Sequence, residues 1–161
     1  MRKTFKIKIK TNIIMGLFSN IIGNSSSNFQ FNKQESLVGF MLSIVASDGH
    51  ISDEEVNDFI QYSNKINILK NIGNKEFNEI IDKVFKVYNR EGLDSLIDKS
   101  AEGLPNDMKL GVFTICCDLA YSDGFIEKEE ENVLEKIVEY LSIDNDTAMN
   151  IVDVISTKNK I

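Results

Sequence analysis

Tryptophan is absent from this 161-residue chain, proline and histidine each occur once, and the only two cysteines are neighbours in the sequence. Because adjacent cysteines cannot join distant segments, a disulfide framework is excluded, and a reducing cytoplasm is the compartment we expect. A single histidine excludes a zinc site built from several histidines. No stretch approaches 18 consecutive apolar residues, so no segment is predicted to cross a membrane.

Basic residues are scarce relative to acidic ones, with 18 Lys and Arg against 25 Asp and Glu and a net charge of −7. The imbalance is uneven, because residues 1–14 hold five basic residues and no acidic one. From Met15 onward the net charge is −12. An acidic surface repels nucleic acid backbones and anionic lipid, so we exclude both as partners. Cations or a basic protein surface are the partners it would attract.

The basic leader, residues 1–14, precedes a polar linker rich in Ser and Asn over residues 24–33. A secretory signal is excluded, because the leader has neither a long apolar stretch nor a small-residue cleavage site. Two interpretations remain, a basic membrane-surface arm and an upstream extension before a translation start at Met15, and we expect the second. We therefore expect residues 1–33 to be leader and linker, disordered or not native before Met15, and residues 34–161 to form one domain.

Apolar residues recur with helical spacing along the rest of the chain. The first set, at i, i+3, i+4, i+7 and i+8, consists of Leu37, Phe40, Met41, Ile44 and Val45. This face predicts a helix that ends at Asp48-Gly49, since Gly suits the left-handed conformation after a helix. Ser52 and Glu55 form a capping box that begins the next helix. Further helices are predicted over about 75–90 and 93–101, from Pro105, after Asp123-Gly124 and over about 144–156. Without a competing strand pattern, the fold is predicted to be all-α, a compact bundle of about seven helices.

The sequence SDGHISDEE at 47–55 returns as SDGFIEKEE at 122–130, an offset of 75 residues. Between segments 47–60 and 122–135, seven of 14 positions are identical. The apolar faces upstream of the two loops also match at this offset. We therefore predict two duplicated helix–loop–helix units related by a pseudo-twofold.

Each loop matches the second half of a calcium-binding EF-hand loop. In the first copy, Asp48, Gly49 and Glu55 would occupy loop positions five, six and 12. Positions one and three, however, would be Ile44 and Ala46, which are apolar helix residues and not carboxylates. A true EF-hand is therefore rejected.

A metal role for these loops needs more oxygen ligands than one loop offers. Ca²⁺ takes about six to eight oxygens, whereas the first loop supplies Asp48, Glu55 and a backbone carbonyl. Binding would therefore be weak, or would require Asp123 and Glu130 to converge on the same site. The loops are also explained without a ligand, since Asp-Gly forms an Asx-type turn and glutamates favour the first turn of a helix. That explanation does not account for the doubling of the glutamates in both copies, and both interpretations stay open.

The two loops resemble those of the tellurite-resistance TerB family and the wider TerB-like domains, compact all-helical domains marked by a loop of the type A-D-G-x-I-S-x-E-E, often present twice. Here the copies read ASDGHISDEE at 46–55 and YSDGFIEKEE at 121–130. They depart from the pattern by a Ser inserted before each Asp-Gly pair and by Tyr121 in place of alanine. The resemblance covers about residues 34–156.

The resemblance implies a cytoplasmic role in resistance to tellurite and other stress, with clustered acidic residues as a site for a weakly bound divalent cation such as Ca²⁺ or Mn²⁺. The residues carried over are Asp48, Glu54, Glu55, Asp123, Glu129 and Glu130. Other TerB-like domains act as adaptors. The alternative function is therefore a metal-free adaptor that docks a basic protein partner through its acidic face.

Nothing else in the sequence indicates catalysis, because no Gly-rich phosphate loop and no Ser/His/Asp set is present. His50 falls in the first loop, where we expect an exposed position with no chemical role. Cys116 and Cys117 align with Met41 and Leu42 at the 75-residue offset, so they are predicted to pack in the core. We expect a binding module and not an enzyme.

Overall fold

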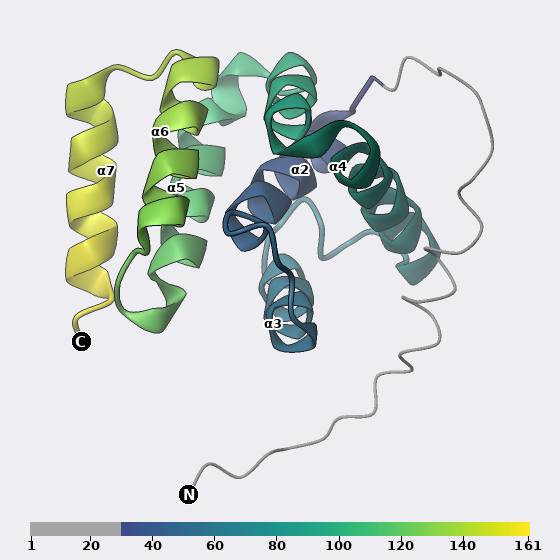
Figure 1. The fold of residues 1–161 in the computed structure, drawn as a ribbon, viewed down its shortest axis with the longest axis horizontal. Coiled ribbons are helices and arrows are strands. Elements are labelled where there is room, and N and C mark those ends of the chain that lie inside the picture. Colours follow the sequence, from purple (N-terminus) through teal and green to yellow (C-terminus); the bar gives the residue numbers. More distant parts are fainter. Residues whose placement is uncertain (1–29) are drawn as a thin grey trace, which may run out of the picture.

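The computed structural model describes residues 30–161, and these residues form six α-helices, two short 3-10 helices and no strand (Figure 1). The α-helices are α2 (Lys33–Val45), α3 (Asp53–Ser63), α4 (Asn74–Glu102), α5 (Lys109–Ala120), α6 (Lys128–Leu141) and α7 (Asn145–Lys158), and the 3-10 helices are η1 (Asn106–Met108) and η2 (Tyr121–Asp123). The prediction of an all-α fold is confirmed. The predictions for the basic leader and for a start at Met15 lie outside the described residues.

Helix α2 is the centre of the fold, packing against α3, α4, α5 and α6 (Figure 1). Its residues from Glu35 to Ile44 are all buried, the polar Glu35, Ser36 and Ser43 among them, so the helix is enclosed on every side and not only on the apolar face that the spacing predicted. The buried hydroxyl of Ser43 donates a hydrogen bond to the Gly39 carbonyl oxygen of the same helix at 2.8 Å, as a polar group in the interior of a protein requires. Phe40 on α2 and Phe113 on α5 are among the largest fully buried side chains, and they mark the core between the two halves of the chain.

Helix α4 approaches α2 so closely that glycine is needed at the crossing. A methyl group at Gly39 would lie 2.1 Å from the Oγ atom of Ser100. Ser100 is itself fully buried and donates a hydrogen bond to the Leu96 carbonyl oxygen at 2.7 Å, so it satisfies its own polar group within α4. The absence of a side chain at Gly39 therefore leaves room for the Ser100 side chain of α4 against α2.

A glycine also divides α4. Gly92 has φ 84° and ψ −178°, a conformation outside the helical region, and Figure 1 shows the chain changing direction within α4. The sequence predicts separate helices over about 75–90 and 93–101, on either side of this residue. The two predicted helices are therefore the two segments of α4, and their division at residue 92 explains why about seven helices are expected.

Helices α5, α6 and α7 form the C-terminal part of the fold, with α5 packed against both of the others (Figure 1). At the N-terminal end, Phe31 belongs to the predicted linker, yet it is buried in the core. Asn32 caps α2 by accepting hydrogen bonds from the backbone N–H groups of Gln34 and Glu35. Within residues 30–161, none of the helices combines the length and the apolar character that crossing a bilayer requires.

Candidate functional site

Each Asp-Gly pair lies in a tight turn that follows a buried helix. Helix α2 ends at Val45 and α5 at Ala120, each three residues before the aspartate, and the 3-10 helix η2 fills the second interval. Gly49 has φ 80° and Gly124 has φ 89°, so both occupy the left-handed region that favours glycine. The predicted helix ends are therefore three residues too late, while the predicted role of the glycines is confirmed.

A capping box begins the helix after each loop. The Ser52 backbone N–H donates to Glu55 Oε2 at 2.6 Å, which confirms the predicted box. In the second copy, the Glu127 backbone N–H donates to Glu130 Oε2 at 2.9 Å. One oxygen of each glutamate thus satisfies the start of its own helix, and the other oxygen is left for interactions outside it.

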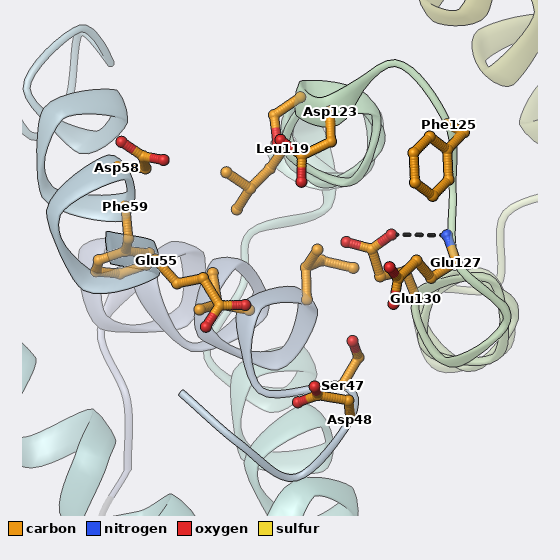
Figure 2. Close-up of a pocket in the computed structure, with 13 residues that line it drawn as sticks. Ser47, Asp48, Glu55, Asp58, Phe59, Leu119, Asp123, Phe125, Glu127 and Glu130 are labelled. Atoms are coloured by element: carbon orange, nitrogen blue, oxygen red, sulfur yellow. Dashed lines mark hydrogen bonds between the residues drawn. The ribbon is translucent and has the colours of Figure 1, made fainter. Parts of the chain in front are cut away.

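The two loops face one pocket of about 220 Å³, although they are 75 residues apart in the sequence (Figure 2). Ile44, Phe59 and Leu119 give it an apolar lining between the loops. Six carboxylate residues line the rest of it, namely Asp48, Glu55, Asp58, Asp123, Glu127 and Glu130. Among the described residues that line it, none is basic. The arrangement concentrates negative charge from both halves of the protein in one place.

The carboxyl of Glu130 lies half-buried among other negative charges of this pocket. Burial raises the pKa of its carboxyl, and the negative charges of Glu127, Asp123 and Glu55 raise it further, against the hydrogen bond from the Glu127 backbone. Glu55 belongs to the first loop and the other two to the second, so the two loops act on one another electrostatically across the pocket. Asp48 accepts a hydrogen bond from the His50 backbone N–H at 2.8 Å, which is the expected Asx-type turn.

Four of the six predicted site residues meet at the pocket and two do not. Asp48, Glu55, Asp123 and Glu130 line it, whereas Glu54 and Glu129 are exposed and are not among its lining residues. Successive helix residues differ by about 100° in direction, so the first glutamate of each pair points away when the second points inward.

Two acidic residues of the pocket, Asp58 and Glu127, were not predicted from the sequence as site residues. Asp58 follows Glu55 by three residues on the same helix face, a local signal that was available. Glu127 occupies the N-cap position that Ser52 holds in the first copy. The replacement of serine by glutamate at this position of the repeat indicates an additional carboxylate beside the second loop.

The donor set suits a hard cation, because it offers carboxylate oxygens and no sulfur or imidazole nitrogen. Ser47 and Ser122 add hydroxyl oxygens to the lining. As the side chains lie, no group of three or more His, Cys, Asp or Glu residues within residues 30–161 is arranged to hold a metal ion. An ion would therefore need carboxylates from both loops to move inward.

The remaining candidates have structural positions. His50 is exposed in the first loop and is not among the residues that line the pocket. Cys116 and Cys117 are fully buried free thiols, which confirms that they belong to the core. Burial raises the pKa of Cys117 to about 12, with a further contribution from the Asp118 charge, and burial also raises that of Cys116. Neither thiol is available as a nucleophile in the folded protein.

An all-helical domain in which two acidic Asp-Gly loops face a common pocket is the class of protein that these observations define. A comparison with protein families matches residues 34–151 to the family described as Tellurite resistance protein TerB. The chain therefore belongs to the TerB family, which confirms the resemblance seen in the loop sequences. Searches of curated proteins and of solved structures find no match.

Proposed function

We propose that this TerB-family domain is a binding module for resistance to tellurite and other stress, and that its acidic pocket binds a divalent cation such as Ca²⁺ or Mn²⁺ weakly. One observation carries the proposal: Asp48 and Glu55 of the first loop line the same pocket as Asp123 and Glu130 of the second. Like charges held close together destabilise the folded state, and a divalent cation between them offsets that repulsion. The pKa of Glu130 is raised first by burial and then by the charges of three acidic neighbours from both loops, and this second contribution supports the repulsion.

The ligands in this proposal come from both loops, since neither loop alone supplies the oxygens that Ca²⁺ takes. Asp48, Glu55 and Glu130 each have one oxygen engaged in a local hydrogen bond and one left for an ion. Water completes the coordination shell. The need to move the loops inward and to order water makes the binding weak.

The proposal extends to the architecture and the compartment. The two helix–loop–helix units are duplicates related by a pseudo-twofold, and the ion lies between them, close to that axis. The repeat at 75 residues and the shared pocket support this arrangement. The module has no enzymatic activity, and it works in the cytoplasm, where its free thiols stay reduced.

A thermal-melt series on the full chain tests the cation proposal. Melting temperatures are measured in EDTA and with Mg²⁺, Ca²⁺, Mn²⁺ or Zn²⁺, because an ion that prefers the folded state raises the melting temperature. We expect a rise with Ca²⁺ or Mn²⁺ that is lost in Asp48→Asn/Asp123→Asn. Glu54→Gln/Glu129→Gln is the matched control, since it removes the same charge outside the pocket and should keep the rise. No rise with any ion, or an equal loss in both variants, overturns the proposal.

The alternative proposal is a metal-free adaptor that docks a basic protein partner on the same acidic pocket. The observation that favours it is Phe125, which lines the pocket and is 62% exposed, an unusual position for a large apolar side chain. A short Lys/Arg-rich peptide is a suitable probe. Binding that weakens with salt, is unchanged by EDTA and is lost in Asp48→Asn/Asp123→Asn would support the adaptor. Its absence would leave the adaptor without support.

A further inference from the structure

A second surface feature lies apart from the acidic residues. An apolar groove of about 400 Å³ runs between the α3–α4 connection, residues 64–73, and the segment formed by η1 and the first half of α5. Its floor is made by Leu37 and Val112, which are buried. Its walls are four half-buried apolar side chains, Ile66, Ile68, Met108 and Ile115. Such a concentration of partly exposed apolar surface indicates a site that another segment covers.

The described chain enters the fold close to this groove. Phe31 lies against Gly103, where an added methyl group would be 2.4 Å from the Phe31 carbonyl oxygen. From Gly103 the chain runs through Pro105 to Met108 in the groove wall, five residues that span at most about 18 Å. Any segment shortly before Phe31 is therefore held within reach of the groove by its own covalent connection.

The sequence before Phe31 contains one segment suited to an apolar groove. Residues 15–23 read MGLFSNIIG, and the polar run NSSSN follows them. The apolar residues Leu17, Phe18, Ile21 and Ile22 fall at i, i+1, i+4 and i+5, and residues 15–23 carry no charged side chain. From Ile22 to Phe31 is nine residues, which span up to about 30 Å. The linker is thus long enough for residues 17–22 to reach the groove.

We propose that residues 17–22 dock into this groove of their own chain and cover Ile66, Ile68 and Ile115. The polar residues 24–28 then connect the docked segment to the folded domain. This arrangement explains why an apolar segment precedes the domain by one short polar linker. Because the segment is covalently attached, its effective concentration at the groove is high, and docking needs little affinity of its own. The proposal is independent of the acidic pocket and of any cation.

A spin label at position 19 tests the docking in the full chain. Cys116 and Cys117 are buried, so a nitroxide reagent labels only the new thiol in Ser19→Cys. In chain enriched at isoleucine methyl groups, we expect the signals of Ile66, Ile68 and Ile115 to lose most of their intensity next to the nitroxide. Reduction of the nitroxide should restore them.

Matched variants separate docking from mere proximity. Adding Phe18→Ser/Ile22→Ser to the labelled chain removes the apolar contacts but keeps the label on the same linker, and the intensities should return. Undiminished signals in the first sample, or equal loss with and without these two substitutions, overturn the proposal. Loss seen only when labelled chain is mixed with separately enriched chain shows docking into a second copy, which also overturns docking within one chain.

Discussion

Tyr62 on α3 donates its phenolic hydrogen to Oδ2 of Asp118 on α5 at 2.8 Å, joining residues 56 positions apart. The other carboxylate oxygen, Oδ1, accepts from the Lys158 ammonium in an ion pair and from the Asn159 side chain at 3.3 Å. Burial, and then this hydrogen bond, raise the pKa of Tyr62, so its hydroxyl remains a donor at physiological pH. One half-buried carboxylate thus ties α3 and the end of α7 to α5.

The first prediction concerns the pH dependence of this contact. Burial raises the pKa of Asp118, but hydrogen bonds from Lys158, Tyr62 and Asn159 outweigh it and hold the pKa below its ordinary value of 3.8. Because the folded pKa is below the unfolded one, the contribution to stability is complete above the unfolded value and is lost as pH falls through the folded value. We expect Asp118→Asn to lower the melting temperature at pH 7 and to flatten its fall below about pH 4.

Asp153→Asn on the exposed side of α7 is the matched control and should change neither quantity. Circular dichroism gives the melting temperatures of the three proteins from about pH 2 to about pH 7, a range that includes the ordinary pKa values of carboxyl groups. An acid limb that is equally steep in Asp118→Asn and in the unchanged chain would contradict the prediction.

The second prediction concerns Glu130, whose pKa is raised by burial and by its negative neighbours from the ordinary value of 4.5. Because the folded pKa lies above the unfolded one, the ionised carboxylate destabilises the folded protein. This destabilisation is complete at pH values above the folded pKa and absent at pH values below the unfolded pKa. We therefore expect Glu130→Gln to raise the melting temperature at pH 7 in EDTA, with a gain that shrinks toward pH 4. Glutamine keeps the acceptor of the capping box.

Glu129→Gln removes an exposed charge beside it and should shift the melting temperature less. The two variants are compared in the same buffers by thermal melts. A lower melting temperature for Glu130→Gln would mean that the capping role of this carboxylate outweighs the repulsion in the pocket.

The third prediction concerns the crossing of α2 and α4. Gly39→Ala places a methyl group 2.1 Å from Ser100 Oγ, a contact that is relieved only if Ser100 rotates away from its hydrogen bond to Leu96 or the helices move apart. Overpacking of this kind costs about 1–3 kcal/mol in the free energy of unfolding. Adding Ser100→Ala removes the clashing oxygen and should restore part of the loss, measured by urea denaturation as a double-mutant cycle.

Gly111→Ala in α5 is the control, because apart from its chain neighbours and the backbone of its own helix no atom lies within 4 Å of the added methyl group. Replacing a helical glycine at an open position stabilises a protein by about 0.4–1 kcal/mol. Equal effects of the two glycine substitutions would show that helix propensity, and not the close approach, decides the result at Gly39.

The fourth prediction concerns thiol reactivity. Cys116 and Cys117 are fully buried with raised pKa values, so a disulfide reagent at pH 8 should modify neither until the chain is unfolded in guanidinium. Thr157→Cys places a thiol at an exposed position on α7 and should react at once in the folded protein. Rapid modification of the native cysteines would show that the core opens around α5.

Much of the fold could be predicted because its signals are local. The capping box of Ser52 and Glu55 and the left-handed glycines depend on residues no more than four positions apart, and the structure has them as expected. The end of α2 was nevertheless predicted three residues too late. The backbone N–H of Gly49 donates to the Ala46 carbonyl oxygen at 3.0 Å, so the last turn tightens out of the α-helix before the glycine is reached.

The composition of the pocket could be predicted only in part. Each loop by itself indicates an acidic turn, but whether Glu55 and Glu130 share a pocket depends on how two segments pack across 75 residues, which periodicity does not encode. The contact between Tyr62 and Asp118 could not be predicted from the sequence for the same reason. Neither residue belongs to a motif, and only the packing of α3 on α2 and of α7 on α5 brings the partners of that carboxylate together.

The contact of Asp118 with the end of α7 joins a residue inside the family match to residues beyond it. The family match ends at residue 151, yet α7 continues to Lys158 and buries Ile155. At the other end, Phe31 is buried although the match starts at residue 34. A fragment trimmed to 34–151 would lack both apolar anchors and would deprive Asp118 of its cation. The packed part of the protein thus extends beyond the matched residues at both ends, and a fragment for expression or fusion should keep Phe31 and the end of α7.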